Sequence, residues 1–213
     1  MSGFKIIKKI ELPQLRIEKR TGDEPFSLNG QPLGITLREF WQWSSSDLVD
    51  NTLRGILAEY IVASALDLTH KPRVGWDAYD LETPAGVKIE VKSAAYLQSW
   101  FQKTYSNICF NIRPTRRYDG STNELDTEVK RQADIYVFCL LKETDKAKVD
   151  PLNLDQWIFY ILPAAELNKR FPTQKTIGLS ALLTLSPRRV KYGQLKSGLE
   201  DLLALNPKSA EAS

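Results

Sequence analysis

The sequence contains few of the residues on which several classes of protein depend. Its 213 residues include two cysteines, Cys109 and Cys139, and one histidine, His70. Two cysteines are too few for a disulfide framework, and their spacing does not match a zinc site. We expect both thiols to be buried, because each lies among apolar residues. One histidine excludes mechanisms that need several, and we expect His70 to lie at the surface.

Long apolar runs are also missing. No stretch approaches the ~20 apolar residues of a membrane span, and the most apolar one, residues 55–66, carries Glu59. Residues 1–13 include basic residues but no long apolar run, so no signal peptide is expected. The formal net charge of +3 permits an acidic partner such as nucleic acid without requiring one. We therefore expect a soluble, cytoplasmic protein that does not bind a membrane.

The composition itself, with 42% hydrophobic and 26% charged residues, is typical of a globular domain with a substantial core. We interpret residues 1–213 as a single domain with its core at about residues 51–162. Residues 1–50 would be an N-terminal addition, and residues 163–205 a C-terminal helical addition. Residues 206–213 are small and polar, which predicts a disordered tail.

Helices are expected at two places in the first third of the chain. Thr36 is a suitable N-cap for a helix over residues 36–43, after an Asn-Gly pair that predicts a tight turn. Residues 52–66 are apolar or small around most of the helical circumference, which is typical of a buried helix. The periodicity of that helix assigns one face to Leu53, Ile56, Leu57, Tyr60, Ile61 and Ser64.

Later segments mix strands and helices. β-Branched and aromatic residues predict strands over residues 107–113, 133–141 and 157–163. Helices are expected over residues 163–171 and 190–205. This mixed order favours an α/β sandwich around one sheet.

A hairpin is predicted around residues 84–86, where proline and glycine fit a three-residue loop. That loop would pair Thr83 with Val87 and would place Asp80 opposite Glu90. Lys92 would project from the same face as Glu90, because side chains alternate along a strand. The assignment depends on the loop length, since a slip of one residue exchanges the two faces.

Three acidic residues and a lysine in apolar surroundings require an explanation. Burying such charges without a compensating ion is costly. Two alternatives remain open: Glu90 and Lys92 form a weak, partly exposed ion pair, and Glu59 lies on a solvated stripe, paired with Arg54. A second acid-x-Lys tripeptide, residues 128–130, lies in a polar segment that we interpret as a helical turn or loop.

The sequence over residues 51–162 resembles the PD-(D/E)XK nuclease superfamily, because it carries Glu59, Asp80 and Glu90-Val91-Lys92 in the order of that superfamily's motif. The resemblance implies a restriction-endonuclease-like fold, an α/β/α sandwich around a mixed central sheet. One departure is Tyr79, which stands where a proline often precedes the aspartate.

The resemblance also implies a Mg²⁺-dependent endonuclease that hydrolyses phosphodiester bonds in DNA. Asp80 and Glu90 would hold Mg²⁺ with the carbonyl group of Val91, and Mn²⁺ would substitute for it. Lys92 would assist the attacking water and stabilise developing charge. Glu59 would accept a hydrogen bond from a water on the ion or help to bind a second ion.

Nucleic-acid contacts are expected from basic clusters and from a glutamine that follows the lysine in some branches of the superfamily. The candidates are Gln98, Arg113, Arg116, Arg117, Arg188, Arg189 and Lys191. Cleavage of both DNA strands would favour a homodimer. The alternatives are a non-catalytic nucleic-acid-binding or regulatory module of the same fold, and a hydrolase acting on RNA or a small molecule.

Overall fold

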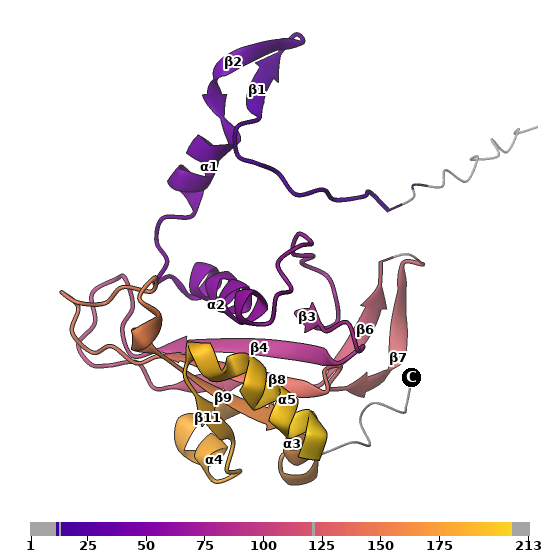
Figure 1. Cartoon of the computed structure of the whole chain (residues 1–213), viewed down its shortest axis with the longest axis vertical. Helices are drawn as coiled ribbons and strands as arrows, with labels where there is room; N and C mark the ends of the chain where they lie inside the picture. Colours follow the sequence, from indigo (N-terminus) through magenta and orange to yellow (C-terminus); the bar gives the residue numbers. More distant parts are fainter. Residues whose placement is uncertain (1–11, 13, 121, 206–213) are drawn as a thin grey trace, which may run out of the picture.

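A five-stranded sheet forms the centre of the computed structural model, which describes residues 12, 14–120 and 122–205 (Figure 1). Its strand order is β11-β9-β8-β4-β3. β4 and β8 are parallel, and the other neighbours are antiparallel. The sheet is therefore mixed, as the sequence predicts. The strands are β3 (Leu81–Glu82), β4 (Lys88–Ala95), β8 (Ile135–Leu141), β9 (Trp157–Pro163) and β11 (Arg188–Val190).

Helices cover both faces of this sheet. α2 (Asn51–Ala65) and α5 (Leu195–Leu205) pack on the face that carries Ile89 and Val91. The other face is covered by α3 (Ala164–Arg170), α4 (Leu179–Leu183) and a small sheet of β5 (Cys109–Asn111) and β10 (Thr176–Gly178). This arrangement is the expected α/β/α sandwich. Short 3-10 helices, η1 (Leu154–Gln156) and η2 (Tyr192–Gln194), precede β9 and α5.

The segment after residue 163 contributes to the sheet and to its cover. β11 pairs with β9 at the sheet edge, and Leu195 and Leu199 of α5 belong to the buried core. The division into one core with two additions remains a prediction. The expected tail at 206–213 lies outside the described residues.

The buried face of α2 matches the predicted one only in part, with Ile61 buried and Leu53, Leu57 and Ser64 half-buried. Ala58, Ile61 and Val62 are buried, whereas Ile56 is 38% and Tyr60 61% exposed. Periodicity alone could not select the face, because apolar residues occupy most of the circumference of α2. Small residues such as Ala58 allow the helix to approach β4 closely.

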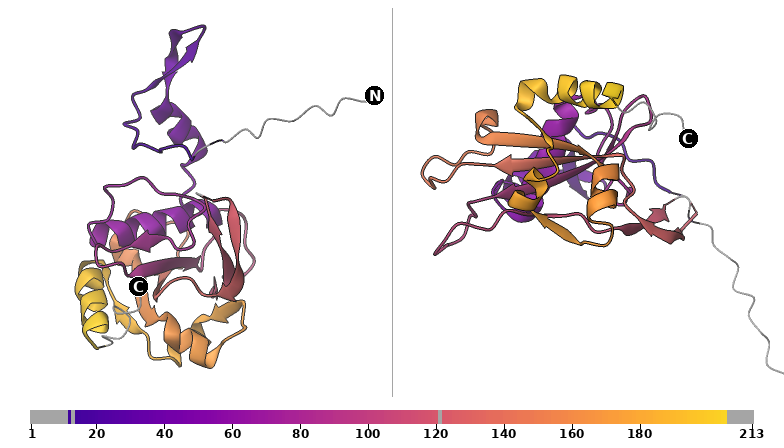
Figure 2. Two further views of the ribbon diagram at one scale, coloured as in Figure 1. Left: turned by 90° about the vertical axis from the view of Figure 1, so that its right-hand side faces the viewer. Right: turned by 90° about the horizontal axis from the view of Figure 1, so that it is seen from below.

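Two hairpins lie outside the sandwich. β1 (Pro25–Leu28) and β2 (Gln31–Thr36) precede α1 (Leu37–Ser44), and the three elements form an N-terminal arm that projects from the body (Figure 2). The predicted turn is present, with positive φ at Asn29 and Gly30. Thr36 caps α1 as expected.

The second hairpin corrects an expectation. β6 (Thr115–Asp119) pairs with β7 (Glu124–Lys130), so residues 128–130 lie on a strand and not in a helical turn or loop. Leu125, Thr127 and Val129 alternate with charged residues, which suits a strand. Cys109 is another correction, because its thiol is exposed while Cys139 is buried. Within the described part of the chain, no helix is long and apolar enough to span a membrane.

Candidate active site

The predicted hairpin register is confirmed. The Gly86 N–H donates to the Thr83 carbonyl (2.9 Å), and the Thr83 N–H donates to Val87 (3.0 Å). Gly86 has φ +80°, a conformation that glycine adopts without strain. Leu81 pairs with Ile89 and the Asp80 N–H donates to the Ile89 carbonyl (3.1 Å), so Asp80 lies opposite Glu90.

Asp80 is the most strongly perturbed carboxyl group near this hairpin. Its Oδ2 accepts a hydrogen bond of 2.7 Å from the Val91 N–H. Burial, followed by the negative charge of Glu90, raises the pKa of Asp80 to about 7, and Lys92 opposes this shift. A carboxylate in this environment is stabilised when it binds a proton or another cation.

Glu90 and Lys92 form an ion pair on the same face of β4. The Lys92 Nζ lies 2.5 Å from the Glu90 Oε1, and the two side chains are 25% and 19% exposed respectively. This pair is neutral in total. The Asp80 charge therefore has no dedicated cation within the hairpin.

Glu59 approaches from α2 and has a partner that the sequence did not indicate. Arg73 donates from Nε to Oε2 and from Nη2 to Oε1 (3.0 Å), which makes the pair bidentate. The hydrogen bond with Glu59 and, to a smaller extent, the charge of Asp80 raise the pKa of Arg73. The alternative pairing of Glu59 with Arg54 is wrong. Arg54 is buried and donates instead to Ser93 and the Val49 carbonyl.

A pocket of about 410 Å³ opens beside Glu59, Arg73 and Asp80 and is large enough for part of a substrate, whereas Glu90 and Lys92 do not line it. Its lining includes Glu59, Arg73, Asp77, Tyr79 and Asp80. The walls are α2 and the loop that leads from α2 to β3. The pocket gives Asp80 and Glu59 access to solvent and to a ligand.

The metal-binding capacity of the site rests on two carboxylates. Among the residues that the structure describes, no group of three or more His, Cys, Asp or Glu is arranged to hold a metal ion. Asp80 and Glu90 nevertheless face each other closely enough for Glu90 to raise the pKa of Asp80. Mg²⁺ is usually bound by one or two carboxylates, waters and substrate phosphate. Asp80 and Glu90 match such an ion in the type and number of carboxylate ligands, while Glu90 is paired with Lys92.

Gln98 does not lie where a phosphate contact requires it. Its side chain is part of a buried polar network and the residue is 7% exposed. The amide oxygen accepts from Arg54 (3.4 Å), and the amide nitrogen donates to Ser106 (3.2 Å). This geometry makes Gln98 a structural residue and not a surface ligand for nucleic acid.

One member of the first basic cluster, Arg117, lies close to the pocket. Arg113, Arg116 and Arg117 are exposed on β6 or just before it. The Arg117 charge counteracts the raised pKa of Asp77, which burial and Glu82 produce. The turn of this hairpin also lies against the loop between α2 and β3. A Cβ atom added to Gly120 would lie only 2.8 Å from Trp76 Nε1 in that loop.

The second basic cluster lies elsewhere. Arg188 and Arg189 are on β11, at the sheet edge opposite β3, and Lys191 follows them (Figure 1). Three inter-strand spacings separate β11 from β4, about 14 Å. Arg188 is also paired with Asp201. The structure therefore does not bring this cluster to Asp80.

A comparison with known protein families gives a match that covers most of the chain. Residues 36–180 match the family model described as bacteriophage T4 endonuclease IV, which is roughly two thirds of the chain. The matched region includes Glu59, Arg73, Asp80, Glu90 and Lys92. A search of curated proteins gives no match.

Proposed function

The chain belongs to the bacteriophage T4 endonuclease IV family, and from this premise we propose that it is a Mg²⁺-dependent endonuclease of the PD-(D/E)XK type that hydrolyses DNA. The observation that carries the proposal is the position of Asp80 opposite Glu90, with Lys92 on the same face of β4. Membership of an endonuclease family and this arrangement of charges both support hydrolysis of phosphodiester bonds.

Asp80 and Glu90 would hold the ion, with the carbonyl group of Val91 as a further oxygen ligand. A bound Mg²⁺ would supply Lewis-acid polarisation of the scissile phosphate and neutralise part of its charge. The hydrolysis joins a water oxygen to phosphorus as the ester P–O bond breaks. Lys92 orients that water, and its ammonium group stabilises negative charge that develops nearby.

Arg73 and Glu59 extend the site toward the pocket. Glu59 can accept a hydrogen bond from a water molecule, and Arg73 can donate two hydrogen bonds to a phosphate in place of the Glu59 carboxylate. Because Arg73 already binds an oxyanion bidentately, little rearrangement separates the two states. We therefore assign Arg73 to substrate binding at the pocket.

DNA would reach the pocket along the β6–β7 hairpin. Arg116 and Arg117 are exposed there, and the hairpin turn contacts the loop between α2 and β3 at Trp76. Contacts of arginine with phosphate position a nucleic acid without reading its sequence. The alternative of a non-catalytic module is favoured by the Glu90–Lys92 ion pair, which needs no metal ion, and the experiment below separates the two.

The test is cleavage of a supercoiled plasmid in Mg²⁺ by the wild type, Asp80→Ala and Lys92→Ala. We expect both variants to lose nicking, while Asp155→Ala, an exposed aspartate on η1, retains it. Nicking that persists in both site variants would contradict the proposal. DNA binding without nicking by the wild type would favour the non-catalytic module. A parallel assay with RNA distinguishes the hydrolase that acts on RNA.

A further inference from the structure

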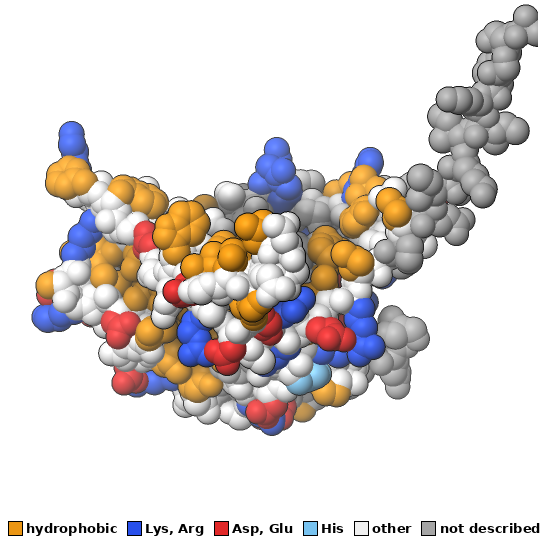
Figure 3. All heavy atoms as spheres, turned by 90° about the horizontal axis from the view of Figure 1, so that it is seen from above, with side chains coloured by type: hydrophobic (Ala, Val, Ile, Leu, Met, Phe, Trp, Pro, Cys, Tyr) orange, Lys and Arg blue, Asp and Glu red, His pale blue; other side chains and the backbone are white. Residues whose placement is uncertain are grey.

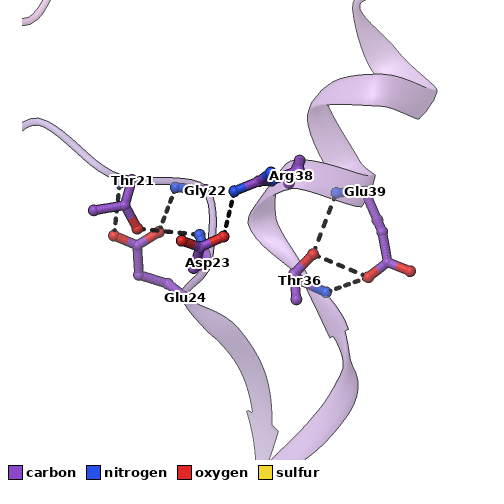
Figure 4. A network of polar contacts seen from close by, with 7 residues as sticks. All are labelled: Thr21, Gly22, Asp23, Glu24, Thr36, Arg38 and Glu39. Carbon is purple, nitrogen blue, oxygen red and sulfur yellow. Dashed lines mark hydrogen bonds and ion pairs between the residues drawn. The ribbon is translucent and has the colours of Figure 1, made fainter.

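The N-terminal arm, residues 21–44, is well ordered by its own hydrogen bonds (Figure 4). The Glu24 carboxylate accepts from the Thr21 and Gly22 N–H groups at 3.0 and 2.9 Å. Arg38 pairs with Asp23, and Thr36 forms a capping box with Glu39. These bonds fix the base of the hairpin to the start of α1.

The arm has an apolar face that no described residue covers. Leu28 on β1 and Leu33 on β2 lie on the same side of the hairpin, because side chains alternate and Leu28 pairs with Gln31, whereas the register shifts between Pro25 and Ser27. α1 buries none of its residues. The exposed fractions are Phe26 44%, Leu28 62%, Leu33 42%, Ile35 48%, Phe40 46%, Trp41 40% and Trp43 85%.

The exposed apolar side chains of the hairpin and of α1 together provide a surface of the order that protein interfaces bury. With about 200 Å² for each aromatic side chain, the exposed fractions of Phe26, Phe40, Trp41 and Trp43 leave roughly 430 Å² on the arm, divided between the hairpin and two sides of α1, and Leu28, Leu33 and Ile35 add to it. A stable dimer of standard size buries about 800 Å² per partner. Figure 3 views the molecule from the side on which the arm projects, and hydrophobic side chains gather at the centre of that view.

The charged residues of the arm indicate which classes of partner it can bind. Residues 25–36 contain no charged residue, and Arg38 is the one basic residue of the arm against three acidic residues. Arg38 is engaged with Asp23. Nucleic acid and anionic lipid both require unpaired basic side chains. The arm offers none of these within residues 21–44.

We infer that the arm is a self-association surface, whose partner is the arm of a second copy of this chain. Two identical apolar faces without charges can meet about a two-fold axis with no like-charge repulsion. A two-stranded hairpin alone is marginal in water, and packing against a second hairpin and helix gives it the missing core. The inference does not depend on the proposed nuclease activity.

The test is sedimentation velocity of the full chain across the micromolar range. We expect a dimer for the wild type, since interfaces of this size dissociate at micromolar concentration or below. Leu28→Glu places two carboxylates in each dimer interface and should weaken self-association by about 100-fold or more. Trp43→Glu should have the same effect.

The matched control is Leu152→Glu. Leu152 is 66% exposed, close to the 62% of Leu28, but lies in the loop before β9. This variant should remain dimeric, and far-UV circular dichroism should show that all variants are folded.

A monomeric wild type would overturn the inference, as would a dimer that survives both arm substitutions. Loss of DNA affinity in Leu28→Glu with a monomeric wild type would assign the arm to nucleic acid instead.

Discussion

Asp80 should destabilise the metal-free protein at alkaline pH, and Asp80→Asn should relieve that cost. The pKa of Asp80 is raised from 3.8 to about 7 by burial and by Glu90. The folded state therefore retains a proton that the unfolded chain has lost between these two values, and stability falls as the pH rises through this window. Asparagine keeps an oxygen that can accept the Val91 N–H.

The magnitude follows from the same two values. A rise from 3.8 to about 7 corresponds to at most about 4 kcal/mol for the ionised carboxylate in the folded state. Asp80 is partly exposed, and solvent screens the repulsion, so we expect about 1–2 kcal/mol in favour of Asp80→Asn at pH 8. For a protein of this size, the midpoint of thermal unfolding should increase by about 3–6 °C.

The assay is urea denaturation in EDTA at several pH values. The gain of Asp80→Asn should be larger at pH 8 than at pH 5, because the folded carboxyl is still protonated at pH 5, where keeping that proton costs less free energy than ionisation does at pH 8. Asp134→Asn is the matched control, because Asp134 likewise accepts a backbone N–H of β4, that of Lys88 at 2.8 Å. An Asp80→Asn variant that is less stable than wild type at pH 8, or equally improved at both pH values, would refute the reasoning.

Three further predictions concern the ion and the substrate. Mg²⁺ or Mn²⁺ should raise the thermal midpoint of the wild type but not that of Asp80→Asn, as measured by differential scanning fluorimetry with Ca²⁺-free protein. Arg73→Ala should lower plasmid nicking by about 10- to 100-fold, and Arg73→Lys should restore little of it, because lysine cannot make the bidentate contact. The double variant Arg116→Ala/Arg117→Ala should reduce the salt dependence of DNA affinity by about two phosphate contacts in a fluorescence-anisotropy titration, whereas Arg189→Ala should leave it close to wild type.

Each of these three predictions has an outcome that would contradict it. An equal thermal shift in Asp80→Asn would place the ion elsewhere, and full nicking by Arg73→Ala would remove that residue from substrate binding. A larger effect of Arg189→Ala than of the double variant would direct DNA to the β11 edge.

The sequence predicted the parts of the site that depend on local geometry. Pro84 and Gly86 determine the loop, the loop determines the register, and the register places Asp80 opposite Glu90. Alternation within β4 then separated the apolar residues from Glu90 and Lys92. The α/β sandwich around one sheet followed from the mixed order of strands and helices, and its three layers from the resemblance to the nuclease superfamily.

The sequence did not predict which side chains contact one another when they lie far apart along the chain. Arg73 lies in a loop without a repeating pattern, so no spacing connected it to Glu59 across 14 positions. Gln98 is polar, which favours an exposed position, yet its side-chain amide is hydrogen-bonded to Arg54 and Ser106 in the protein interior. The face of α2 was ambiguous because too many of its residues are apolar.

The hairpin loop has a consequence for how insertions would affect the candidate site. Asp80, Glu90 and Lys92 are gathered by a continuous stretch of chain, so their mutual placement is encoded locally and needs no distant segment to align them. Lengthening the connections at 97–108 or 142–153 would leave that placement intact, whereas a one-residue shift in the pairing of β3 with β4 would turn Asp80 to the far side of the sheet. Tolerance of insertions is thus distributed very unevenly along this molecule.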